Sequence, residues 1–115
     1  MADEDIYEQV QVETAKSVYD QAVAAYQAGD MQQALELGLR LQDMDGCSEN
    51  GRYSAWYFIG KGYLANGDYH NALAYLSAYL NTPLGHRTNR EANLESFLAA
   101  YNGEQRQFDG EHIYD

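Results

Sequence analysis

The chain has 115 residues, of which 18 are acidic and 7 basic, so its formal net charge is −11. That length suits a single domain. Direct binding to nucleic-acid phosphates or to an anionic membrane surface is not expected, because both demand a basic patch. The acidic N-terminus lacks the basic start and apolar run of a secretory signal, and no apolar run is long enough to span a membrane. The single Cys47 excludes an internal disulfide framework and a cysteine-based zinc site. We therefore expect a soluble cytoplasmic protein without a cofactor or metal.

The first predicted element is a helical hairpin over residues 14–47. Val18, Ala22, Ala25 and Gly29 keep the spacing of one face of an amphipathic helix. Gly29 can adopt positive φ at the helix end, and the aspartate after it can cap the next helix. The apolar stripe of that next helix consists of Ala34, Leu35, Leu37, Gly38 and Leu41.

The second predicted hairpin, over residues 53–84, repeats the first at an offset of 38 residues. Gly67-Asp68 follows Gly29-Asp30 at this offset, and Ala72 follows Ala34. The helix pattern then ends at Pro83, because proline biases the preceding residue away from helical geometry. A loop over residues 43–52 joins the two copies.

An end helix is predicted over residues 88–102. Thr88 and Glu91 have the spacing of a capping box, and Gly103 is expected to end the helix. The apolar side chains between them keep helical spacing: Leu94, Phe97, Leu98 and Tyr101. We expect one domain over residues 1–103 and a polar tail over residues 104–115, either loose or packed back as a strap.

With these positions in place, the sequence resembles a tetratricopeptide repeat (TPR) protein over residues 14–83. The second copy carries the motif residues Trp56, Gly60, Tyr63, Gly67, Tyr69 and Ala72. The first copy is degenerate, with Val18 in place of the tryptophan and Met31 in place of the turn tyrosine. The resemblance implies an all-α, right-handed superhelical array of about five helices, with two TPR hairpins.

The motif has a physical reason in packing. Ala22 and Gly60 are small because the partner helix of each hairpin crosses there, and Ala34 and Ala72 allow the same approach from the other side. Tyr63 and Tyr69 are large flat side chains that fill the space between successive hairpins. These residues serve packing and carry no chemistry.

The resemblance implies a protein-binding function, because TPR proteins bind segments of other proteins along a concave face made by the first helix of each repeat. The residues expected to face this groove are Lys16, Tyr19, Val23, Tyr26, Tyr57, Phe58, Lys61 and Leu64. Tyr26 and Leu64 fit packing against the next helix equally well. Such a surface suits an amphipathic helix or an extended apolar peptide, as in an adaptor or a chaperone.

Two functions are not expected. Some TPR domains clamp the C-terminal carboxylate of heat-shock chaperones, but Tyr19 and Val23 stand where that clamp has its first lysine and asparagine. An enzyme is not expected either, because the three histidines, His70, His86 and His112, share no spacing with acids that would form a metal set or a catalytic base.

Further alternatives concern self-association and the acidic N-terminus. Two repeats are few for a stable array, so a homodimer could supply the missing burial. The first helix could begin as early as Asp5, and residues 1–13 contain five acids and no base. That segment is a solvated helix start, a patch that steers a basic partner, or part of a mimic of nucleic acid.

Overall fold

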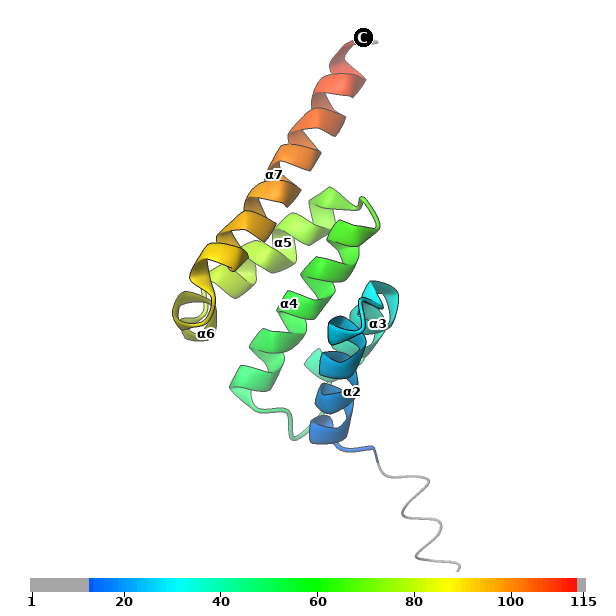
Figure 1. Ribbon diagram of the computed structural model, residues 1–115, viewed down its shortest axis with the longest axis vertical. Helices are drawn as coiled ribbons and strands as arrows, with labels where there is room; N and C mark the ends of the chain where they lie inside the picture. Colours follow the sequence, from blue (N-terminus) through cyan, green and yellow to red (C-terminus); the bar gives the residue numbers. More distant parts are fainter. Residues whose placement is uncertain (1–12, 114–115) are drawn as a thin grey trace, which may run out of the picture.

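The computed structural model describes residues 13–113, except for the side chains of residues 109–113. Every regular element within these residues is a helix, and the helices pack as a stack of antiparallel hairpins (Figure 1). The helices are α2 (Ala15–Gln27), α3 (Met31–Gln42), α4 (Glu49–Ala65), α5 (Tyr69–Leu80), α6 (Pro83–Arg87) and α7 (Arg90–Ile113). The all-α prediction is confirmed, although α6 was not among the five predicted helices. The predicted start at Asp5 lies outside the described residues.

The two hairpins turn in the same way. Gly29 and Gly67 have φ angles of +80° and +74°, a conformation that glycine adopts at little cost. The carboxylates of Asp30 and Asp68 then cap α3 and α5 by accepting a hydrogen bond from the amide three residues later. In both turns the aspartate amide also donates to the carbonyl five residues earlier, at 2.9 and 3.0 Å. The Gly-Asp pair thus sets the same turn in both copies, as predicted.

Small residues let the helices approach closely. A Cβ atom on Gly60 would lie 2.7 Å from Cγ of Leu76, so α4 meets α5 there, as the motif predicts. A Cβ atom on Gly62 would lie 2.5 Å from Cβ of Leu35, which shows that α4 is equally close to α3 of the preceding hairpin. The alanines at the predicted close contacts are fully buried: Ala22, Ala34 and Ala72.

Aromatic side chains of the motif lie at the edges of this packing. Tyr63 packs against Tyr75, with ring centroids 6.0 Å apart, and Trp56 packs against Tyr53 at 5.4 Å. Trp56 is half-buried, whereas Val18 at the same place in the first copy is fully buried. The core itself is aliphatic, and its largest fully buried side chains are Leu41, Ile59, Leu76 and Val18.

The contact between α7 and α5 repeats the contact between α4 and α3. The Asn66 amide of the α4 C-cap donates to Gln32 of α3 at 3.1 Å. At the offset of 38 residues, Asn66 corresponds to Glu104 of α7 and Gln32 corresponds to His70 of α5. Glu104 and His70 are also hydrogen-bonded, at 3.0 Å. The 38-residue offset of the sequence therefore extends to α7. This helix packs on α5 in the position that the first helix of a third repeat would take.

The segment between α5 and α7 differs from the prediction. The Thr82 hydroxyl caps α6 and Pro83 occupies its first turn, so this proline starts a short helix as well as following the end of α5. Gly85 is required there, because a Cβ atom would overlap the Tyr79 carbonyl oxygen. The buried Asn93 amide donates to the carbonyls of Gly85 and Thr88, at 3.1 and 2.7 Å, and so ties α6 to α7.

The predicted bounds of the end helix were wrong. α7 begins at Arg90 and runs through Gly103 to Ile113, so residues 104–113 are helical rather than a loose tail. Gly103 does not end the helix, because it is a buried contact point: a Cβ atom there would lie 2.5 Å from the Tyr69 ring. The Gln107 amide then donates to the Gly67 carbonyl at 3.2 Å. Figure 1 shows the C-terminal half of α7 projecting beyond the other helices.

Candidate functional site

Three hollows follow one another along α2 and α4, and together we call them the groove. The first lies at the N-terminal ends of both helices, has a volume of about 420 Å³ and is closed by Leu84 of α6. The second, of about 300 Å³, is lined by residues of α2, α4, α5 and α7. The third, of about 550 Å³, lies at the C-terminal ends of α2 and α4. Ser54 lines both the first and the second hollow, and Tyr26 both the second and the third.

Aromatic rings from three helices pack beneath the middle of the groove. The ring of Phe58 lies 6.4 Å from that of Tyr19 and 5.6 Å from that of Tyr26. Tyr57 packs against Tyr26 at 5.7 Å and against Tyr79 of α5 at 5.0 Å. The hydroxyls of Tyr26 and Tyr57 are hydrogen-bonded at 3.1 Å. The floor is thus preformed and joins the two hairpins.

The phenols of Tyr57 and Tyr79 in this floor stay protonated at neutral pH. Burial raises the pKa of Tyr57, and its hydrogen bond with the Tyr26 hydroxyl raises it further. Burial also raises the pKa of Tyr79. Desolvation disfavours the charged phenolate in both cases. These hydroxyls therefore offer hydrogen bonds to a ligand and do not act as bases.

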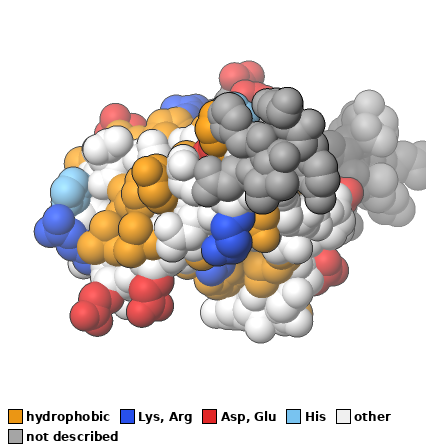
Figure 2. All heavy atoms as spheres, turned by 90° about the horizontal axis from the view of Figure 1, so that it is seen from above, with side chains coloured by type: hydrophobic (Ala, Val, Ile, Leu, Met, Phe, Trp, Pro, Cys, Tyr) orange, Lys and Arg blue, Asp and Glu red, His pale blue; other side chains and the backbone are white. Residues whose placement is uncertain are grey.

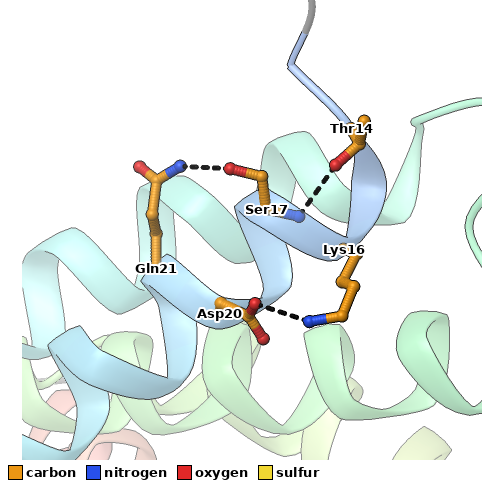
Figure 3. Close-up of polar contacts among 5 residues, drawn as sticks. All are labelled: Thr14, Lys16, Ser17, Asp20 and Gln21. Atoms are coloured by element: carbon orange, nitrogen blue, oxygen red, sulfur yellow. Dashed lines mark hydrogen bonds and ion pairs between the residues drawn. The ribbon is translucent and has the colours of Figure 1, made fainter.

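A lysine stands toward each end of the groove, and these two are the only lysines in the sequence. Lys16 lines the first hollow and forms an exposed ion pair with Asp20 at 2.9 Å (Figure 3). Lys61 lines the third hollow, donates to Ser96 of α7 at 3.1 Å and lies 5.9 Å from the centre of the Tyr57 ring. An exposed pair such as Lys16–Asp20 contributes little stability and can exchange for a ligand.

The position of Lys16 follows from the local start of α2. The Thr14 hydroxyl accepts a hydrogen bond from the Ser17 amide at 3.1 Å and caps the helix, while the Gln21 amide donates to the Ser17 hydroxyl at 3.3 Å. Figure 3 shows these contacts on one side of α2 and the Lys16–Asp20 pair on another. Because the cap fixes where α2 begins, it also fixes the side of the helix on which Lys16 lies, which is the side of the first hollow.

The groove contains no acidic side chain among the residues that line its three hollows, although the chain has 18 acids. Its polar groups are hydroxyls, amides and the two lysines. They include Ser48, Asn50 and Ser54 on the α4 side and Asn89 and Asn93 on the α7 side. The charged side chains that line the three hollows are thus the two lysines, of which Lys16 is paired with Asp20.

The predicted groove residues are placed as follows. Seven of the eight line one of the hollows: Lys16, Tyr19, Tyr26, Tyr57, Phe58, Lys61 and Leu64. Phe58 is only 7% exposed and serves as floor more than as contact surface. Val23 is half-buried, packs against the core shared by α2, α3 and α4, and lines none of the three hollows.

Sequence reasoning missed the wall made by α6 and α7. Leu84, Asn89 and Asn93 line the groove from this side. The one sequence signal was Thr82-Pro83, which combines an N-cap residue with the residue favoured at the first helical position. The prediction used this proline only as the end of α5.

Comparison with known protein families, with curated proteins and with solved structures gives no match. Within residues 13–113, no helix combines the length and the apolar character needed to cross a membrane. Among the side chains that the structure describes, those of residues 13–108, no three or more histidines, cysteines, aspartates or glutamates come together in a group that could hold a metal ion.

Proposed function

We propose that this chain is a non-enzymatic, TPR-like module that binds a segment of another protein in the groove along α2 and α4. The observation that carries the proposal is the aromatic floor of Tyr26, Tyr57 and Phe58, which lines the second of three neighbouring hollows. Aromatic side chains held by packing offer a large contact area at low entropic cost, and they dominate the binding energy of many interfaces. The repeated Gly-Asp turns support the TPR-like reading.

The distribution of charge supports a particular kind of segment. The net charge of −11 favoured a basic partner, but no acidic side chain lines the three hollows and both lysines do. The acid that an ion pair places beside them is Asp20, for which a basic side chain would have to compete with Lys16. We therefore propose that the segment is apolar, without lysine or arginine at its contact positions, and that a carboxylate on it is tolerated near Lys16 or Lys61.

The length of the groove supports a short helix or an extended peptide. The three hollows run from the first turn of α2 to its last turn, a helix of 13 residues. At 1.5 Å of rise per residue this is about 20 Å, which a helical segment of about 13 residues or an extended one of about 6 would span.

Selection from a random peptide library tests the proposal. Peptides are selected on the immobilised chain and their affinities are then measured by fluorescence anisotropy. We expect selected sequences with two or more large apolar residues and no lysine or arginine. Substituting Ser54→Trp fills the point that the first two hollows share, so it should weaken their binding about tenfold or more, which is about 1.4 kcal/mol.

The matched control is Gln33→Trp, which places the same side chain on the exposed surface of α3. It should leave binding unchanged. Selected peptides that bind both variants as well as the unmodified chain would show that they use another surface. Selected peptides rich in lysine and arginine would contradict the proposed chemistry of the segment.

A further inference from the structure

A chain of hydrogen-bonded side chains connects α7 to α2 beneath the groove. The ammonium of Lys61 in α4 donates to the hydroxyl of Ser96 in α7 at 3.1 Å. Ser96 is hydrogen-bonded in turn to the hydroxyl of Tyr57. The Tyr57 hydroxyl is also hydrogen-bonded to the hydroxyl of Tyr26 in α2, at 3.1 Å. Ser96 is only 6% exposed and lines none of the three hollows, so this link of the chain lies out of reach of a bound segment.

The direction of these hydrogen bonds is set from the lysine end. An ammonium can only donate, so the Ser96 oxygen accepts from Lys61 and the single hydroxyl hydrogen of Ser96 is left for Tyr57. Burial has the largest effect on the pKa of Tyr57 and raises it, while the bond with Tyr26 also raises it and the bond with Ser96 lowers it. A phenol that donates is held in its neutral form, whereas a phenol that accepts ionises more readily. Tyr57 therefore accepts from Ser96 and donates to Tyr26.

The hydroxyl hydrogen of Tyr26 is left at the end of this chain. The Tyr26 oxygen accepts from Tyr57, and no other described residue forms a hydrogen bond with the Tyr26 hydroxyl. Tyr26 lines both the second and the third hollow. A hydrogen-bond donor is therefore available to a ligand where these two hollows adjoin.

The charge at the other end of the chain strengthens this donor. Lys61 forms no ion pair with a described residue, so no carboxylate within ion-pair distance offsets its charge. Figure 2, seen from the end where α7 projects, shows the acidic side chains mostly along the outline of that face. Successive hydrogen bonds polarise one another, and a cation at the head of the series makes its last hydrogen a better donor.

We infer that the Tyr26 hydroxyl determines the specificity of the groove by donating to a carbonyl or carboxylate oxygen of the bound segment. This inference rests on the proposed function and adds to it the polar group that an otherwise apolar segment presents. A segment with an apolar group or a donor at this point would leave the Tyr26 hydrogen without a partner, which costs binding free energy. Ser96 is a positioning residue, because it acts by keeping Tyr57 as a donor to Tyr26.

Removal of one hydroxyl tests the donor. The probe is a peptide selected from the random library whose binding Ser54→Trp weakens, with affinities measured by fluorescence anisotropy. Tyr26→Phe keeps the ring and its packing and should weaken binding about fivefold or more. The control Tyr63→Phe removes a hydroxyl of α4 outside the three hollows and should leave binding unchanged. Equal affinities for Tyr26→Phe and the unmodified chain would overturn this inference alone, whereas failure to select any such peptide would overturn the proposed function as well.

A double-mutant cycle tests the direction of the chain. In a Ser96→Ala background Tyr57 loses the donor that orients it, so Tyr26→Phe should then weaken binding only about twofold. Ser96→Ala also releases Lys61, but both members of the comparison carry this change and its effect cancels. Losses of the same size in the two backgrounds would overturn the chain from Lys61 to Tyr26.

Changes in the peptide identify the acceptor. If it is a backbone carbonyl, replacing one amide by a thioamide, a weaker acceptor, should reduce affinity for the unmodified chain and not for Tyr26→Phe. If it is a side-chain carboxylate, replacing one glutamate by methionine or one aspartate by leucine should do so instead. The inference is overturned if every such change affects the two proteins equally.

Discussion

The two hairpins, α2–α3 and α4–α5, share one backbone design but differ in their large side chains. Both turn on a Gly-Asp pair with almost identical φ angles, and both bury a small residue where the two helices cross. Met31 in the first hairpin corresponds to Tyr69 in the second, and Val18 corresponds to Trp56. The comparison teaches that the turn depends on a few small or capping residues. Of the large motif residues, Tyr69 instead shapes the contact with the next helix, at Gly103.

The largest effect is expected where the first hairpin meets the second. Gly62→Ala would bring a Cβ atom to 2.5 Å from Cβ of Leu35 and to 2.9 Å from the Met31 carbonyl oxygen, and the backbone cannot yield cheaply. We expect a loss of about 3 kcal/mol in the free energy of unfolding, measured by urea denaturation. Gly51→Ala, also in α4, meets only the side-chain ends of Ser48 and Cys47 and should cost far less. Equal costs would contradict the close α3–α4 contact.

A smaller effect is expected where the second hairpin meets α7. Gly103→Ala places a Cβ atom 2.5 Å from the Tyr69 ring, which is half-buried and has room to move. We expect a loss of about 2 kcal/mol and faster hydrogen exchange in α7. Adding Tyr69→Met installs the residue of the first hairpin, whose flexible side chain adapts to the extra methyl group. The double variant should therefore recover part of the loss, and a further loss would show that the ring is not the obstacle.

A matched pair of substitutions tests whether the two turns are equivalent. Gly29→Ala and Gly67→Ala each meet no atom within 4 Å, so the only cost is that of a positive φ for a residue with a side chain. We expect each to lower the free energy of unfolding by about 1 kcal/mol. The two losses should agree within about 0.5 kcal/mol. Clearly unequal losses would show that the contacts around the turns differ more than their backbones do.

The smallest effect concerns pH. The hydrogen bond that the His70 ring donates to the Glu104 carboxylate raises the pKa of His70 above 6.5, and the charge of the carboxylate adds to this. Because the pKa of His70 is higher in the folded state, protonation of His70 stabilises the fold. This stabilisation is fully present below pH 6.5 and is lost as the pH rises through the raised pKa. Gln32, at the same place in the first hairpin, does not titrate. Between pH 5.5 and 8, the midpoint temperature of thermal unfolding should fall slightly more for the unmodified chain than for His70→Gln. The difference should be small because His70 is exposed. Identical shifts would contradict the prediction.

Much of the fold was predictable, because its signals are local. The 38-residue offset, the Gly-Asp turns and the small residues at the crossings all lie within the segments that they organise. Pro83 and Gly103 show the opposite. α5 ends before Pro83, as predicted, but the start of α6 at this proline was missed, and Gly103 was wrongly expected to end a helix. Each residue type commonly stops a helix, yet Pro83 begins α6 and Gly103 lies inside α7. What decides the case of Gly103 is the Tyr69 ring, which is 34 residues away in the chain.

The candidate site was predictable on one side only. The family resemblance pointed to residues of α2 and α4, and most of them line the hollows. Leu84 and Asn93 form the other wall, and their place depends on how the chain turns after Pro83. That turn requires the close approach of Gly85 to the Tyr79 carbonyl and the two hydrogen bonds of the buried Asn93 amide. These contacts could not be predicted from the spacing of residues in the sequence.

The location of both lysines on the groove has a practical consequence. Side-chain amines occur only at Lys16 and Lys61, so amine-reactive dyes, cross-linkers and biotinylating reagents attach along this face. Coupling the protein to a sensor surface through its lysine side chains would turn the groove toward the matrix and hide it from a binding partner. Amine labelling in solution can also report whether the groove is occupied. A bound partner should slow the labelling of Lys16 and Lys61 relative to that of the N-terminal amine.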